Sequence, residues 1–136
     1  MSNIVEVVAS YRNLGVLGKS VKAAGLEEIL SQPGPFTVFA PTDMAFGKLA
    51  AGELPELLKP ENKTKLADFM NDHVVKGKTN FKDLVDGQVL TTVSGKELSV
   101  QVTNGEVDIE GARIQKKDME ASNGVIHSLN KLMLIN

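Results

Sequence analysis

The sequence predicts an α+β domain, with helices mainly in the N-terminal half and strands after them. Three observations predict this class. Apolar residues recur with helical spacing up to Ala24 and again after Pro60. From Gln88 onward apolar and polar residues alternate, as in half-buried strands. The closing segment Val125–Ile135 is apolar on both of its faces, so we expect it to be a central strand covered on both sides.

Local signals place the helices. Asn3 and Glu6 have the spacing of a capping box, and Gly25 is suited to end the helical stretch that begins after Asn3. We expect further helical segments at residues 26–30, 42–49 and 54–58. A longer helix is predicted to open at Pro60. Its buried face consists of Leu66, Phe69 and Met70.

The strands are marked by β-branched and aromatic runs with turn residues at their ends. Phe36–Ala40 lies between prolines, and His73–Val75 forms a second short run closed by glycine. In the second half Asn104-Gly105 predicts a tight hairpin. Asn123-Gly124 predicts another turn, in which both residues would adopt the positive backbone angles of that motif.

Composition narrows the class of function. The 136 residues fit one domain, taken as 1–136, and 15 basic against 17 acidic residues leave a net charge of −2. Such a balance provides no field for nucleic acid or an anionic membrane surface. The absence of cysteine excludes disulfides and thiol chemistry, and no apolar stretch is long enough to span a membrane. No signal-peptide pattern opens the chain, so we expect either a cytosolic protein or one whose signal segment was removed, and the sequence does not separate the two.

Three segments match motifs of one family. Thr37–Phe46 follows the pattern T-x-F-A-P-T-x-x-A-F, and Asn123–Leu134 resembles N-G-x-I-H-x-I-x-x-V-L. Between them, Asp72–Gly77 corresponds to Y-H-V-V-x-G, with Asp72 in place of the tyrosine. In order and spacing these segments resemble the fasciclin-like (FAS1) domain over essentially the whole chain.

The resemblance implies a β-wedge, two small sheets set at an angle with helices packed alongside. It also implies a secreted, periplasmic or cell-surface protein, and leans toward a stand-alone prokaryotic member. FAS1 domains mostly serve in cell adhesion, through a cell-surface or matrix protein or glycan. We therefore expect no enzymatic activity, no cofactor, no metal site, no nucleic acid and no membrane insertion, and a monomer is favoured.

Physical reasons assign most motif residues to folding rather than recognition. Phe39 and Phe46 are expected to anchor a strand–helix junction, where Pro41 keeps the preceding residue extended and Thr42 caps the helix. His127 shares a strand face with apolar residues, so we expect it to be buried and hydrogen-bonded. The complete structural set is Thr37, Phe39, Pro41, Thr42, Phe46, Asn123, Gly124 and His127.

Four residues are candidates for contact with a partner. Asp118 and Met119 occupy the place of an Asp-Ile pair that belongs to proposed integrin-recognition motifs in animal FAS1 domains, with methionine replacing isoleucine. Asp72 and His73 are weaker candidates, because the family's tyrosine is absent. The competing interpretation of Asp118 is an ordinary charged loop between strands.

Two other classes of function stay open. One is a carrier or receptor for a small apolar ligand, which would need a pocket of several hundred Å³. The other is a hydrolase using paired carboxylates, although no spacing in the sequence selects a pair. Against both, the sequence favours an adhesion or binding module that acts by surface contact outside the cytoplasm.

Overall fold

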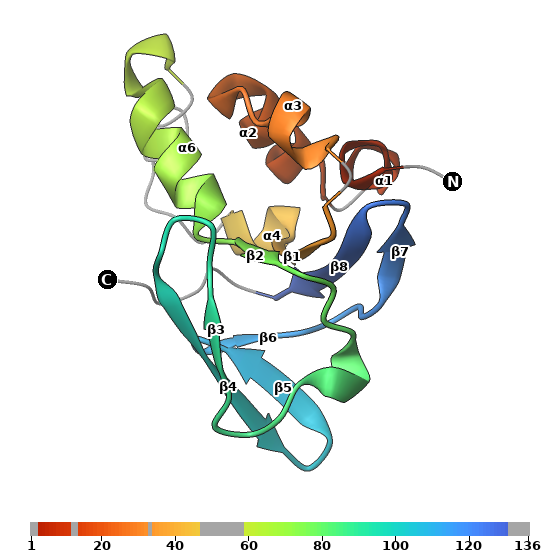
Figure 1. Cartoon of the computed structure of the whole chain (residues 1–136). Coiled ribbons are helices and arrows are strands. Elements are labelled where there is room, and N and C mark those ends of the chain that lie inside the picture. The colour runs from red at the N-terminus through yellow and green to blue at the C-terminus, as the bar shows by residue number, and fades with distance from the viewer. Residues whose placement is uncertain (1–2, 12–13, 33, 47–58, 131–136) are drawn as a thin grey trace.

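The computed structural model describes residues 3–11, 14–32, 34–46 and 59–130 (Figure 1). Its helical elements lie mainly in the first half, as predicted. They are α1 Ile4–Ser10, α2 Gly15–Ala24, α3 Glu27–Leu30, α4 Asp43–Phe46, α6 Lys63–Asn71 and the short 3₁₀ turns η2 Pro60–Asn62 and η3 Phe81–Asp83. The strands are β1 Phe36–Pro41, β2 Val74–Lys76, β3 Val89–Thr91, β4 Glu97–Thr103, β5 Glu106–Ile109, β6 Ala112–Arg113, β7 Met119–Ala121 and β8 Gly124–Leu129.

The strands form two four-stranded sheets, one in the order β2-β1-β8-β7 and the other in the order β3-β4-β5-β6. Figure 1 shows the helices α1, α2 and α3 over the first sheet, on the side away from the second sheet. Two isolated bridges, Val75 with Thr92 and Ile114 with Leu129, join the sheets. The α+β class and the arrangement of two small sheets with helices alongside are therefore confirmed.

The strand β8 is central, as its apolar pattern predicts. It pairs with β1 in parallel and with β7 in antiparallel orientation, and all six of its residues are buried. Because β1 and β8 come from the two family motifs, the best-matched segments of the sequence lie side by side. The remainder of the predicted strand, after Asn130, lies outside the described residues.

Two apolar cores cover the two faces of the first sheet. Alternate residues of β1 divide between them, since Val38 packs with the helices whereas Phe39 faces the second sheet. The helix-side core includes Ile4, Leu17 and Leu66. The core between the sheets includes Leu98, Val100, Ile109 and Leu129.

Most of the predicted local signals are confirmed. The side chain of Asn3 accepts from the backbone N–H of Glu6, whose carboxylate accepts from Asn3 N–H. Gly25 ends α2 with a left-handed φ of 73°. Thr42 Oγ1 accepts from Ala45 N–H at 3.4 Å, and Asn104-Gly105 turns the β4–β5 hairpin with φ values of 53° and 81°.

The prediction for Asn123-Gly124 is wrong in its backbone geometry. The turn lies at residues 122–123, Gly124 already belongs to β8, and neither Asn123 nor Gly124 has a left-handed φ. A Cβ on Gly124 would lie 2.0 Å from the carbonyl oxygen of Phe36, so close backbone approach requires the glycine. The Asn123 side chain accepts from Ile4 N–H and donates to the carbonyls of Leu30 and Gln32. It therefore ties α1 and the α3–β1 connection to the sheet.

Some predictions concern residues that the structure does not describe. The helical turn expected at residues 54–58 and the end of the helix expected at 42–49 lie outside the described residues. The side chain of Phe46, predicted to anchor the strand–helix junction, lies outside them as well. Its predicted partner Phe39 is fully buried.

Candidate functional site

An exposed loop is fastened along the second family motif. This segment, Gln115–Asp118, connects β6 to β7 and is called the Asp118 loop below. Gln115 N–H donates to Ser128 O, and Ser128 N–H donates to Lys116 O, both at 2.8 Å. The Ser128 hydroxyl oxygen also accepts from Lys116 N–H at 2.9 Å. The loop is thus held by backbone and side-chain bonds to the most buried strand of the fold.

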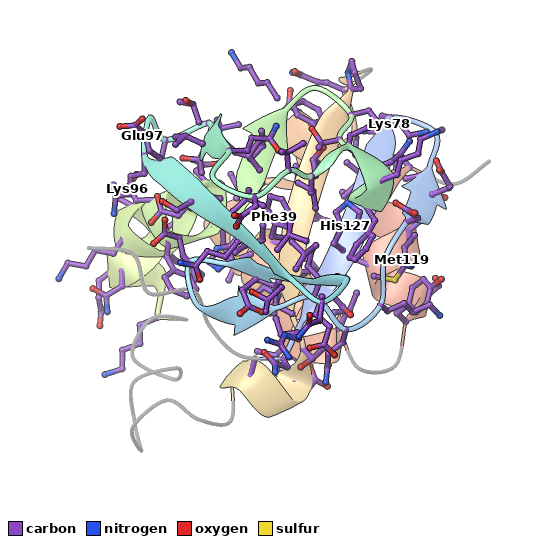
Figure 2. All side chains as sticks on the ribbon, turned by 90° about the horizontal axis from the view of Figure 1, so that it is seen from below. Phe39, Lys78, Lys96, Glu97, Met119 and His127 are labelled. Carbon is purple, nitrogen blue, oxygen red and sulfur yellow. The ribbon has the colours of Figure 1, made fainter. Side chains whose placement is uncertain are left out.

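His127 supplies the next attachment. It is fully buried, and its ring stacks on Phe39 with centroids 5.8 Å apart (Figure 2). Its Nδ1 accepts the backbone N–H of Asp118 at 3.2 Å, and its Nε2 lies 2.9 Å from the carbonyl oxygen of Thr79. Both contacts are satisfied when the neutral ring carries its proton on Nε2. The prediction of a buried, hydrogen-bonded histidine is confirmed.

The electrostatic environment keeps His127 neutral. Burial lowers the pKa of His127 below its ordinary value, opposed by the bond to Thr79 and the charges of Asp118 and Glu120. A proton on Nδ1 would place two donors against each other, because Asp118 presents its N–H to that atom. The neutral ring is therefore the form that positions the loop.

Asp118 is exposed and conformationally fixed. Its φ of 54° is in the left-handed region, which aspartate tolerates better than most residues. Its carboxylate accepts from Phe81 N–H at 2.9 Å, so the side chain reaches the first residue of η3. Asp118 is thereby held through both its backbone and its side chain, and it still presents negative charge to solvent.

Two lysines, Lys116 and Lys117, directly precede Asp118 in the loop. Lys116 Nζ lies 4.6 Å from the ring centroid of Tyr11, and Lys117 Nζ lies 4.2 Å from that of Phe81. Cation–π contacts of this kind restrict long side chains that would otherwise move freely. A further lysine, Lys78, pairs with Glu120 at 2.6 Å. The site offers a fixed pattern of positive and negative groups on one surface.

The neighbouring segment 77–81 is the part that sequence reasoning missed. Thr37 Oγ1, fully buried, donates to Gly77 O at 2.7 Å and accepts from Thr79 N–H at 2.8 Å. Thr79 O in turn receives the proton of His127. The first residue of one motif and the histidine of the other thus hold the same segment. No local signal marks this role, because the partners lie more than forty residues away in sequence.

Met119 is not a contact residue. Only 4% of it is exposed, and it belongs to the helix-side core. The reason is the strand alternation of β7, in which Met119 and Ala121 point inward and Glu120 points outward. The pairing of Asp118 with Met119 on one partner surface is therefore corrected to Asp118 alone.

Asp72 and His73 also lie inside. Asp72 accepts from the Ser94 hydroxyl at 2.5 Å and from Lys96 Nζ at 3.2 Å, so its carboxylate joins the end of α6 to the β3–β4 turn. His73 is 2% exposed and donates from Nδ1 to Phe69 O at 2.8 Å. The tentative partner role is corrected for both residues, because neither presents a free polar group at the surface.

Neither a metal-binding cluster nor a membrane-spanning helix is found among the described residues. Between residues 3 and 130, apart from the gaps given above, no group of three histidine or acidic side chains could hold a metal ion. Within the same ranges, no helix is long and apolar enough to cross a bilayer.

A parallel strand pair from two distant motifs, set between a helical layer and a second sheet, defines a particular class of α+β wedge. The family model of the fasciclin domain matches residues 13–135. The chain belongs to the fasciclin (FAS1) family, and the predicted resemblance is confirmed.

The relatives include two proteins of Synechocystis sp. "Protein sll1483" is 44% identical over 131 residues, covering 96% of this chain and 72% of that protein. "Uncharacterized protein sll1735" is 38% identical over 135 residues, covering 99% of both chains, so that relative consists of one such domain. Among solved structures, the FAS1 domain pair of the insect cell adhesion molecule Fasciclin I superposes with a TM-score of 0.88. It shares 18% identity and covers 98% of this chain and 51% of that one, which shows the common fold.

Proposed function

We propose that this protein is an adhesion module that binds a protein or glycan of the cell surface, periplasm or extracellular matrix. The observation that carries the proposal is the exposed residue Asp118, whose backbone N–H is held by His127 and whose carboxylate accepts from Phe81 N–H. The two preceding lysines, Lys116 and Lys117, rest on aromatic rings. A rigid surface loses little entropy on binding, so a preorganised loop is suited to recognition. Membership of a family found in a cell adhesion molecule supports the same function.

Recognition by contact, without catalysis, fits the state of the polar side chains at this site. Both histidines are buried, so neither can meet a substrate. The carboxylate of Asp72 is taken up by Ser94 and Lys96, and that of Asp118 accepts a backbone N–H. These bonds leave the hydrolase alternative without an available pair of carboxylates at these positions.

The carrier alternative is not supported by the cavities of the described chain. The cavity with an almost wholly apolar lining has a volume of about 30 Å³, which is far below the several hundred Å³ of a ligand pocket. A larger hollow of about 520 Å³ beside Phe36 and Lys76 is open and partly polar.

A charge-only substitution tests the adhesion proposal. Asp118→Asn keeps an acceptor for Phe81 N–H and tolerates the left-handed φ, so it removes the charge and leaves the loop in place. The matched control is Glu110→Gln. Glu110 also has a positive φ, 48°, and its carboxylate also accepts a backbone N–H, from Ser99.

The measurement is retention of beads coated with each variant on the envelope or matrix fraction of the source organism. We expect Asp118→Asn to lose most of the retention and Glu110→Gln to keep it. Equal retention by all three proteins would remove the Asp118 loop from the account of adhesion.

A further inference from the structure

A second surface lies along the seam between α1 and α2, and none of its lining residues belongs to the Asp118 loop. Its deep end is an apolar cavity of about 30 Å³ whose floor is buried, and a shallower hollow of about 190 Å³ continues it. The two share Ala9, Gly18 and Lys22, so they form one groove. The groove is lined at the deep end by Ile4, Val5, Val8, Val21 and Leu30, and at the shallow end by Leu14, Gly15 and Lys19. We call it the α1–α2 groove.

Gly18 leaves space in this groove, although the fold does not require a glycine at this position. It lies inside α2, where glycine is less favourable than alanine. Its φ is not left-handed, and a Cβ placed on it would lie 3.9 Å from Val8 Cγ1, an ordinary contact distance. Neither backbone geometry nor packing therefore requires glycine here. The missing side chain has its effect on the surface, where it allows another molecule to approach the helix backbone closely.

Two lysines stand on the rim of the groove, and the Asp43 carboxylate, which accepts from Val16 N–H, lies at its Gly15 end. Lys19 and Lys22 are exposed and lie one helical turn apart, and α2 contains no acidic residue. Neither lysine forms an ion pair with an acid in the described part of the chain. A partner that filled the apolar floor would bring its neighbouring groups against these two ammonium groups, which favours negative charge in that partner.

We propose that the α1–α2 groove binds an acidic amphipathic helix of a partner protein. One aliphatic side chain would enter the deep end between Val5, Val8 and Gly18, and a second, one turn away, would lie in the shallower hollow. Flanking Asp or Glu would meet Lys19 and Lys22. The deep cavity has room for only the tip of one side chain, and the shallower hollow takes the adjacent turn. This surface is distinct from the Asp118 loop and does not depend on it.

The test is a selection from a displayed library of helices of about 16 residues, which span about 24 Å. The library is selected in parallel on the wild-type protein and on Gly18→Leu, which fills the groove. Binders specific to the wild type are then measured against Gly18→Ala, Lys19→Glu/Lys22→Glu and the control Lys65→Glu, an exposed lysine of α6.

We expect wild-type-specific binders to carry aliphatic residues at helical spacing with flanking Asp or Glu. The double charge reversal should weaken them about tenfold or more, and Lys65→Glu should leave them unchanged. Gly18→Ala should weaken them too while raising the melting temperature, because alanine is the better helix former. This opposite movement of binding and stability separates a recognition role for Gly18 from a folding role.

Three results would overturn the proposal. One is that no binder distinguishes the wild type from Gly18→Leu. Another is that the selected helices are basic, or bind the charge-reversed variant equally well. The last is that no helix is selected, whereas the wild type binds sodium decanoate in a titration and the same variants lose that binding. This result would make the groove a site for a fatty acid.

Discussion

The two histidines lie on either side of Phe39 in the first sheet and differ in how their rings are satisfied. His127 uses both ring nitrogens, one for Asp118 N–H and one for Thr79 O. His73 uses only Nδ1, and its Nε2 is buried without a partner. In Figure 2 Lys78, the residue before Thr79, and Lys96, which pairs with Asp72, lie on opposite sides of the molecule. The comparison shows that His127 positions an exposed loop because its ring accepts from Asp118 N–H, whereas His73 bonds only to the carbonyl of Phe69.

The largest effect is expected at His127. His127→Ala leaves a cavity beside Phe39 and removes the partners of Asp118 N–H and Thr79 O. We expect a loss of about 3–5 kcal/mol in the free energy of unfolding, from the cavity and the unsatisfied groups together. Chemical denaturation at pH 7 measures it, and a loss below about 1 kcal/mol would contradict the described bonding.

Acid should destabilise the protein mainly through His73. Burial lowers the pKa of His73 to about 4 from its ordinary 6.5, against the bond to Phe69 and the charge of Asp72. The unfolded chain therefore takes up the proton first as the pH falls. The contribution of neutral His73 to the free energy of unfolding is fully present above pH 6.5, the pKa of this histidine in the unfolded chain. It declines between pH 6.5 and about 4, by roughly 3 kcal/mol in all. Unfolding curves recorded across this range would show no such slope if His73 titrated normally.

Replacing His73 should sharpen this contrast. His73→Leu removes the unsatisfied Nε2 but also removes the hydrogen bond from Nδ1 to the carbonyl oxygen of Phe69. These effects oppose each other, so we expect a change within about 1–2 kcal/mol at pH 7. The slope between pH 6.5 and 4 should flatten strongly. An unchanged slope would assign the acid sensitivity to His127 or to another group.

The smallest effect is expected at Asp72, the residue before His73 in the sequence. Asp72→Asn removes the charge that Lys96 pairs with but keeps an acceptor for the Ser94 hydroxyl. Because the lysine is 44% exposed, solvent screens the pair, and we expect a loss of about 0.5–1 kcal/mol that shrinks in high salt. A loss that does not change with salt would mean that packing, not charge, is what the aspartate provides.

Much of the fold could be predicted because its signals are local. The capping box at Asn3, the stop at Gly25 and the hairpin at Asn104-Gly105 each depend on residues close in sequence. The apolar character of β8 was enough to place it at the centre of a sheet and to bury His127. Such signals carry over directly from sequence to structure.

The site could be predicted only in part, because its bonds join distant segments. Asp118 was found through the family resemblance, but its contacts with Phe81 and His127 depend on tertiary packing. The burial of Met119 did have a signal, since Met119-Glu120-Ala121 alternates as a strand does. The motif resemblance took precedence over that alternation. For Asn123 the side chain, rather than the backbone angle, turned out to be what the position uses.

We infer above that His127 positions the Asp118 loop, which requires Nδ1 of its ring to act as an acceptor. The tautomer of His127 is therefore the decisive measurement. Nitrogen-15 NMR of the imidazole at pH 7, with hydrogen exchange of the Asp118 amide, measures both sides of that bond. The account predicts a neutral ring protonated on Nε2 and a slowly exchanging Asp118 N–H. A proton on Nδ1, or an Asp118 amide that exchanges as fast as an open loop, would contradict it.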